Sequence, residues 1–171
     1  MIMARVFIGI GSNIEPDENI RRALHLLAEE FKITAISTFY HTEAWENSEQ
    51  PDFYNGVVEV ETEIPPLKLK QFVLHNIEKA LGRVHSLDKY VSRTIDLDLL
   101  IYDDELLNTE ELVIPDPNIE ERPFLAIPLA ELAPELELPG TGRLLKDIAA
   151  KFVNHKMEPL LSYTENLRKE L

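Results

Sequence analysis

Cysteine is absent from this 171-residue sequence, and tryptophan occurs only once. Without cysteine the chain has no disulfide and no thiolate metal site, so a bound metal would have oxygen or imidazole ligands, which favours magnesium over zinc. No apolar run reaches the roughly 20 residues that a membrane-spanning helix needs, and the first eleven residues lack a charged leader and a cleavage site. We therefore expect a cytoplasmic protein.

Basic residues are scarce as well. The sequence has 17 Lys and Arg residues against 31 Asp and Glu, which gives a formal net charge of −14. This charge repels nucleic acid and anionic membranes at long range, so we expect neither as a partner. A phosphorylated small ligand would need a local basic pocket or bridging metal ions. The length fits a single domain over residues 1–171, and we expect a monomer.

Hydrophobic periodicity predicts the order strand, helix, strand, strand, helix, strand. The expected strands are 6–10, 33–42, 53–63 and 93–102, and the expected helices are 16–31 and 65–81. This order describes an α+β protein, a ferredoxin-like α/β sandwich with an antiparallel sheet, helices on one face and the other face free for a site. After a turn at Asp103-Asp104 we expect a short pairing segment near 106–107. A helix over 124–132 and one or two helices beyond residue 144 should follow, the latter covering the sheet.

The clearest chemical signal is the stretch 93–101, where acidic and apolar residues alternate at the period of a strand. Asp96 and Asp98 then share one face, about 6.6 Å apart, and the apolar residues between them line the other. Two like charges this close on an apolar strand are costly unless a cation lies between them. Magnesium suits this position, because it is usually held by one or two carboxylates together with water and phosphate oxygens. The alternative is an edge strand with two solvated aspartates.

A basic segment directly precedes this strand. Between residues 83 and 93, Arg83, Lys89 and Arg93 against Asp88 give a net charge of +2, to which His85 can add. Surface variation alone can produce such a cluster, but its place beside the paired aspartates favours phosphate binding. Glu78 lies beside the inner face of the preceding helix, and we expect it to be solvated unless the following loop folds back over it.

Several short stretches together resemble one family, the 6-hydroxymethyl-7,8-dihydropterin pyrophosphokinases of folate biosynthesis. They are Ile10-Gly11-Ser12-Asn13, Thr38-Phe39-Tyr40, Gln50-Pro51-Asp52-Phe53-Tyr54-Asn55, Gly82-Arg83-Val84, Ser92-Arg93-Thr94-Ile95-Asp96-Leu97-Asp98 and Arg122-Pro123-Phe124. The resemblance extends over residues 4–150. It implies the ferredoxin-like fold and a transfer of the pyrophosphoryl group of ATP to the hydroxymethyl oxygen of a reduced pterin, with release of AMP.

The same resemblance assigns roles to the residues that match the family's motifs. Asp96 and Asp98 match aspartates that hold two Mg²⁺ ions along the triphosphate of ATP, the co-substrate. Arg83 and Arg93 match arginines that bind the transferring phosphates. The expected ATP-binding positions are Glu78, His85, Tyr90, Arg93 and Arg122.

For the pterin, the resemblance implies a stacking slot and a few amide partners. Phe53 and Phe124 match the two aromatic side chains that sandwich the ring, and Asn55 matches the amide that reads its edge. Thr42, Glu43 and Trp45 lie where the family uses backbone groups. For either phenylalanine alone, core packing is the alternative.

The chain also departs from the family pattern on the nucleotide side. His85 stands where a second arginine is frequent, Val91 where a small residue is usual, and Asp116 where a histidine between prolines is common. We therefore expect a working enzyme with a weaker or differently shaped nucleotide pocket. The alternatives are a non-catalytic pterin- or nucleotide-binding relative and an interaction domain that uses its acidic face.

Overall fold

The computed structural model describes residues 2–44, 49–83 and 94–171. Its centre is a six-stranded sheet in the order β5-β1-β4-β3-β8, with β2 also paired to β4. The strands are β1 (Ala4–Ser12), β2 (Lys32–Ile36), β3 (Tyr40–Thr42), β4 (Phe53–Thr62), β5 (Asp96–Tyr102) and β8 (Glu158–Pro159). Their pairings are antiparallel. The expected antiparallel α+β fold is confirmed.

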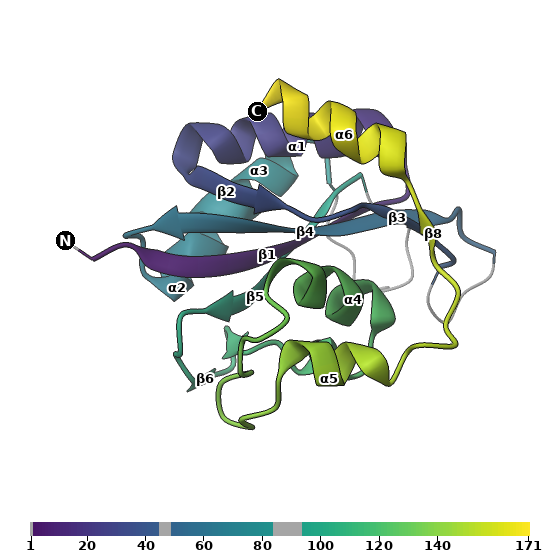
Figure 1. Ribbon diagram of the computed structural model, residues 1–171. Helices are drawn as coiled ribbons and strands as arrows, with labels where there is room; N and C mark the ends of the chain where they lie inside the picture. Colours follow the sequence, from purple (N-terminus) through teal and green to yellow (C-terminus); the bar gives the residue numbers. More distant parts are fainter. Residues whose placement is uncertain (1, 45–48, 84–93) are drawn as a thin grey trace.

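One face of the sheet is covered by α1 (Pro16–Glu30), α3 (His75–Ala80) and α6 (Leu161–Glu170), as Figure 1 shows. Alternate residues of β1 point to this face and pack with the apolar stripe of α1 in one buried cluster, which includes Val6, Ile8, Ile10, Ile20, Leu24 and Leu27. Val58 and Val60 of β4 belong to the same cluster, because side chains two apart on a strand share a face.

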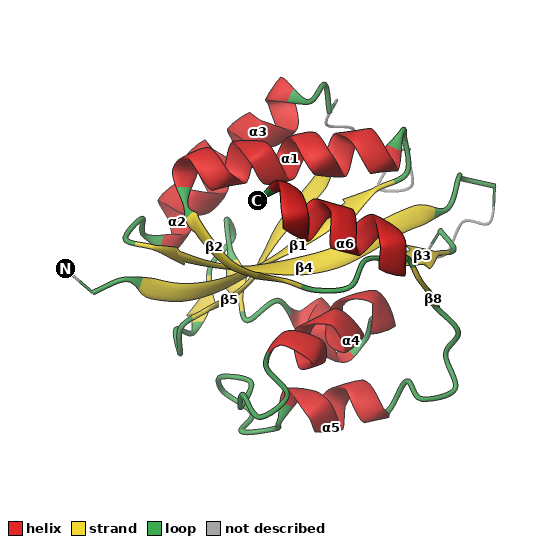
Figure 2. Ribbon diagram, turned by 45° about the horizontal axis from the view of Figure 1, so that its top comes forward, coloured by secondary structure: helices red, strands yellow, loops and turns green. Residues whose placement is uncertain are grey.

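The other face carries a second, smaller core. Phe7, Val57 and Leu100 point away from α1 and pack against α4 (Pro123–Leu132) and α5 (Leu145–Ala150). Figures 1 and 2 both show these two helices on the side of the sheet opposite to α1. The expectation of helices on one face therefore holds for α1 and α3, whereas α4 and α5 also cover part of the second face. The area covered by α4 and α5 does not extend fully over Asn55, Asp96 and Asp98, whose side chains are only partly buried.

The segment 33–42, expected as one strand, is two strands separated at residues 37–39. At residues 37–39 and opposite them, several backbone N–H groups donate to side chains instead of to a neighbouring strand. The Ser37 hydroxyl accepts the N–H of Val57 (2.8 Å), and the N–H and hydroxyl of Thr38 donate to the Glu131 carboxylate of α4 (2.6 and 2.5 Å). Phe39 is completely buried, and its N–H donates to the Thr164 hydroxyl (2.9 Å). These side-chain contacts replace the pairing of a continuous strand.

Two further segments differ in detail from the sequence-based expectation. The helix expected over 65–81 is made of α2 (Pro66–Lys68), a π-helical stretch η1 (Leu69–Leu74) and α3. Gly82, at φ +82°, follows it. After the turn at residues 103–104, β6 (Leu107–Asn108) pairs with β7 (Val113–Ile114) rather than with β5. A 3-10 turn, η2 (Pro117–Glu120), then leads to α4.

The C-terminal segment closes the β3 edge of the sheet. β8 pairs with Tyr40 and His41, and the N–H of Leu160 donates to the carbonyl of Phe39 (2.8 Å). Helix α6 lies beside α1 (Figure 2). The Tyr163 hydroxyl of α6 donates to the carbonyl of Asp17 in α1 (2.8 Å). In the described part of the chain, no helix combines the length and apolar character that crossing a lipid bilayer requires.

We expect Thr164→Val to destabilise the protein by about 1–3 kcal/mol, because the buried N–H of Phe39 then loses its acceptor. Urea unfolding followed by circular dichroism measures the change. Thr164→Ser keeps the hydroxyl and serves as the control, with a smaller loss. Equal stabilities of the valine and serine variants would contradict this role of the hydroxyl.

Candidate active site

Three neighbouring strands bring the predicted side chains to one end of the second sheet face. Gly11 of β1 lies opposite Asn55 on β4 and opposite Asp96 on β5, and Gly9 lies opposite Asp98. Side chains two apart share a face, so Asp96 and Asp98 lie on the α4 side with Leu100. The apolar residues that alternate with them are buried on the α1 side: Ile95, Leu97 and Leu99. The predicted sharing of one face by the two aspartates is confirmed.

The Arg83 side chain links α3 to the start of β5 through hydrogen bonds. Its Nη1 donates to Glu78 and to Asp96 Oδ1, the latter at 2.7 Å. Glu78 also accepts the backbone N–H of Leu97 (3.1 Å), and only 5% of its surface is exposed. Of the two alternatives expected for Glu78, the buried one holds, because Arg83, three residues after α3, folds back onto the carboxylate.

Burial and mutual repulsion disturb the ionisation of these carboxyl groups. Burial raises the pKa of Glu78 to about 7 in spite of the neighbouring Arg83 guanidinium. The pKa of Asp98 is well above its usual range, first through burial and then through the negative charges of Asp96 and Asp116. For Arg83, burial is outweighed by Asp96 and Glu78, which together raise the guanidinium pKa. This concentration of negative charge favours a bound cation.

The donor set fits magnesium bound together with a phosphorylated substrate. Within residues 2–44, 49–83 and 94–171, no three His, Asp or Glu side chains converge on a metal position. A closed site made of protein ligands is thus not seen there. Two carboxylates that leave the other positions to water and phosphate oxygens are the usual protein share of a Mg²⁺ site, and Asp96 and Asp98 supply such a pair.

Two buried polar residues at the end of β1 tie the surroundings of the site together. The Ser12 hydroxyl donates to the carbonyl of Thr94 (2.6 Å), and the Asn13 amide donates to the carbonyl of Pro51 (3.2 Å). In the sequence analysis these residues appear only as part of a family motif, with no role assigned to them. Their signal was present, since two adjacent polar residues that follow a continuous apolar strand need buried partners.

The remaining predicted residues fall into two groups. Asn55 donates from Nδ2 to the Thr42 hydroxyl (2.8 Å), Glu43 is exposed just after β3, and the Arg122 guanidinium lies 5.9 Å from the centre of the Phe124 ring at the start of α4. Phe53 lies beside Gly11. Four predicted residues lie outside the described residues: Trp45, His85, Tyr90 and Arg93.

Asp116 lies close enough to the paired aspartates to disturb them. Its backbone N–H donates to the carbonyl of Leu100 on β5 (2.9 Å), and its carboxylate accepts the N–H of Asn118 (2.9 Å). Burial raises its pKa, and Asp96 raises it further, whereas Asn118 and Arg122 oppose the rise. Asp116 therefore lies within electrostatic reach of Asp96 and Arg122.

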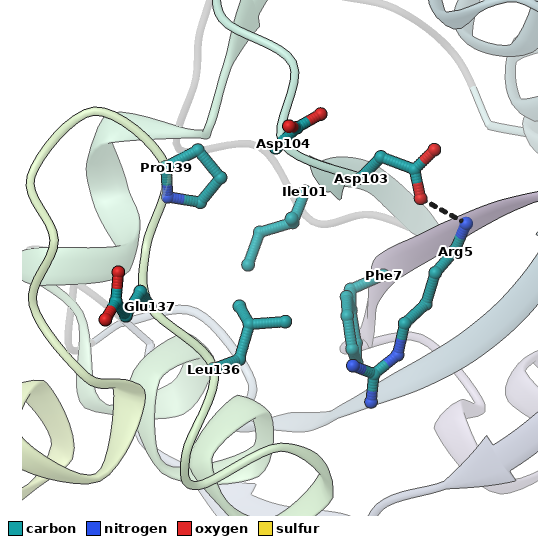
Figure 3. Close-up of a pocket in the computed structure, with 8 residues that line it drawn as sticks. All are labelled: Arg5, Phe7, Ile101, Asp103, Asp104, Leu136, Glu137 and Pro139. Atoms are coloured by element: carbon teal, nitrogen blue, oxygen red, sulfur yellow. Dashed lines mark hydrogen bonds between the residues drawn. The ribbon is translucent and has the colours of Figure 1, made fainter.

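A separate cavity of about 390 Å³ lies at the other end of β1 and β5 (Figure 3). Its apolar lining includes Phe7, Ile101 and Leu136, and its polar lining includes Arg5 and Asp103, where the Arg5 N–H donates to the Asp103 carboxylate (2.7 Å). None of the residues predicted for catalysis or binding lines it. We therefore place the candidate active site at the Asp96 and Asn55 end of the sheet.

A ferredoxin-like sheet with carboxylates and an arginine gathered at one end defines, as a class, an α+β protein whose charged cluster suits a metal ion bound together with a phosphorylated ligand. Comparison with known proteins agrees. Residues 7–134 match the family model described as 7,8-dihydro-6-hydroxymethylpterin-pyrophosphokinase. The chain therefore belongs to that pyrophosphokinase family.

Curated relatives support this assignment over almost the whole chain. A 2-amino-4-hydroxy-6-hydroxymethyldihydropteridine pyrophosphokinase of Haemophilus influenzae is 35% identical over 158 residues, 91% of this chain and 97% of the relative. The protein of the same name from Pseudomonas aeruginosa is 38% identical over 152 residues, 87% of this chain and 92% of the relative.

Solved structures confirm the fold. Wild-type HPPK-DHPS of Plasmodium falciparum, determined with pteroate, superimposes with a TM-score of 0.71 at 16% identity, over 89% of this chain. The chain spans 43% of the length of that protein. At this identity the likeness concerns the fold alone.

The raised pKa of Glu78 predicts how stability depends on pH. The folded value of about 7 exceeds the ordinary 4.5, so between these values the folded protein binds more protons than the unfolded chain. Stability must then fall as pH rises from about 4.5 to about 7. In urea unfolding of the unliganded protein, Glu78→Gln should reduce this fall by about 2 kcal/mol.

The exposed carboxyl of Glu63 offers a matched control, since Glu63→Gln removes the same kind of group at the surface. We expect Glu63→Gln to retain the wild-type dependence on pH. If Glu78→Gln retained it as well, the disturbed ionisation of Glu78 would be refuted.

Proposed function

We propose that this chain transfers the pyrophosphoryl group of ATP to the hydroxymethyl oxygen of 6-hydroxymethyl-7,8-dihydropterin, releasing AMP, in folate biosynthesis. The observation that carries the proposal is the placement of Asp96 and Asp98 on the sheet face that also presents Asn55, in a member of this family. In this proposal β5 supplies ligands for the metal and the triphosphate, and β4, two strands away across β1, supplies the amide that hydrogen-bonds to the heterocycle.

In the proposed step the hydroxymethyl oxygen attacks the β-phosphorus of ATP. The bond between that phosphorus and the oxygen bridging to the α-phosphate breaks, AMP leaves with the bridging oxygen, and the hydroxyl proton passes to solvent. Such transfers need positioning and charge stabilisation more than covalent help from the protein. Two Mg²⁺ ions held by Asp96 and Asp98 would neutralise the triphosphate oxygens.

The arginines would act on the transferring phosphates. Ion pairs with Glu78 and Asp96 hold the Arg83 guanidinium in place, so its remaining N–H groups would donate to the phosphates from a fixed position. Arg93 would also donate to these phosphates. We propose that Glu78 contributes to ATP binding indirectly, by orienting Arg83. Its carboxylate already accepts hydrogen bonds from Arg83 and from the N–H of Leu97. His85, Tyr90 and Arg122 complete the proposed ATP subsite, in which Asp116 would weaken nucleotide binding.

The pterin would lie on the sheet face near Gly11. Phe53 and Phe124 would stack on the two sides of the ring, and Asn55 would hydrogen-bond to its polar edge. Backbone groups of Thr42, Glu43 and Trp45 would add hydrogen bonds. The partly buried state of Phe53 and Phe124 leaves ring surface available for stacking.

We further propose that the chain works as a monomeric single domain over residues 1–171 in the cytoplasm, with ATP and a reduced pterin as its partners. The net charge of −14 opposes association with nucleic acid and anionic membranes.

The direct test is to incubate the protein with ATP, Mg²⁺ and 6-hydroxymethyl-7,8-dihydropterin and to separate the nucleotides by chromatography. We expect AMP that depends on the pterin. ADP in place of AMP would identify transfer of a single phosphoryl group and overturn the proposal, and pterin binding without AMP would identify a non-catalytic binding protein.

We expect Asp98→Asn to lower kcat about 10²-fold or more, because a neutral amide is a poor Mg²⁺ ligand and the triphosphate charge is then less neutralised. The same AMP assay, run at saturating ATP and pterin, measures the loss. Asp104→Asn is the matched control, since Asp104 is an exposed aspartate beyond the far end of the same strand. Near-normal turnover of Asp98→Asn would refute the metal assignment.

A further inference from the structure

We propose that the hydroxyl of Thr42 is a positioning group that fixes the amide of Asn55 and thereby determines which edge of the pterin this enzyme accepts. The inference rests on the proposed function, since it assigns Asn55 to the pterin. It goes further in giving the side chain of Thr42 a role, whereas the family resemblance points only to backbone groups at this position.

The Asn55 amide lies between two neighbouring strands. On the β3 side, Nδ2 donates to the Thr42 hydroxyl at 2.8 Å, and Thr42 is only 7% exposed. On the β1 side, Oδ1 lies over Gly11, only 2.5 Å from the place where a Cβ on that glycine would be. The amide therefore extends across the sheet, with nitrogen towards β3 and oxygen towards β1. A side chain at residue 11 would remove the room for the oxygen.

This arrangement leaves a defined set of hydrogen-bonding groups for a ligand. An asparagine amide has two N–H donors and one carbonyl oxygen, and one donor is occupied by Thr42. One N–H and the oxygen remain. The lactam edge of a pterin presents an N–H beside a C=O, so a fixed amide can pair with both groups at once. If the amide turned over, donor and acceptor would exchange places and this pairing would be lost.

Thr42 is itself held firmly enough to serve as a reference point. It lies in β3, where it pairs with Phe53 of β4. The other edge of β3 pairs with β8, and the Leu160 N–H donates to the Phe39 carbonyl just before the strand. Thr42 thus pairs with β4, the two residues before it pair with β8, and its side chain is buried, so the hydroxyl is held in place against the amide.

Thr42→Val replaces the hydroxyl with a methyl group of similar size and removes the acceptor. We expect the dissociation constant of 6-hydroxymethylpterin, measured by its fluorescence, to rise about 3- to 10-fold, the effect of one lost hydrogen bond. In the AMP assay the pterin KM should rise by a similar factor, with kcat and the ATP KM little changed. Thr42→Ser retains the hydroxyl and should restore binding.

A specificity measurement separates orientation from general loosening. The 2,4-diamino analogue of the pterin lacks the lactam and reverses the donor and acceptor order at that edge. The wild-type protein should bind the lactam more tightly than this analogue, and Thr42→Val should reduce the ratio. An unchanged ratio would overturn the inference even if both ligands bound more weakly.

A double-mutant cycle completes the test. If Thr42 acts through Asn55, Thr42→Val should have no further effect on pterin binding in the Asn55→Ala background. An equal effect in both backgrounds would show a merely structural role and overturn the inference. Because binding is measured without ATP, the cycle is decided even if no AMP is formed. Failure of the wild-type protein to bind the pterin would overturn both proposals.

Discussion

The guanidinium of Arg83, held between Glu78 and Asp96, is the contact on which the candidate site depends. It joins the end of a helix to the first residue of β5, two segments whose carboxylates would otherwise repel each other at close range. Even so, burial keeps the pKa of Glu78 at about 7 and that of Asp98 well above its usual range. One arginine thus assembles the cluster without neutralising it, which leaves an electrostatic demand that a metal and its substrate can meet.

Two glycines of β1, Gly9 and Gly11, mark the boundary between the core under α4 and the candidate site. At Gly9 the side chains of Leu125 and Leu100 approach closely, so α4 can pack directly on the strand. At Gly11, two residues further on, the same face accommodates the Asn55 amide instead. A single strand therefore changes from core to site within two residues. The site lies at the boundary of the surface that α4 covers, where polar side chains stay partly buried and yet accessible to ligand.

Local pattern predicted what depends on local geometry. Alternation located the face shared by Asp96 and Asp98, opposite to the buried Ile95, Leu97 and Leu99. Partners far along the chain decided the features that pattern could not predict. Thr38 and Phe39 interrupt the second predicted strand because they bind Glu131 and Thr164, 93 and 125 residues away. Glu78 is buried because Arg83 and Leu97 bind it, and no period in its helix contains that information.

Asp116 illustrates how a departure from a family pattern can have a structural cause. Its carboxylate accepts the N–H of Asn118 and so caps η2, the short turn that leads to Arg122 and α4. Its own N–H is bonded to Leu100 on β5, so the residue connects the strand of the paired aspartates to the segment that carries Phe124. Its negative charge is partly compensated by Asn118 and Arg122. Asp116 thus links the strand of the paired aspartates to the segment that carries Arg122 and Phe124, two residues that the proposed reaction uses.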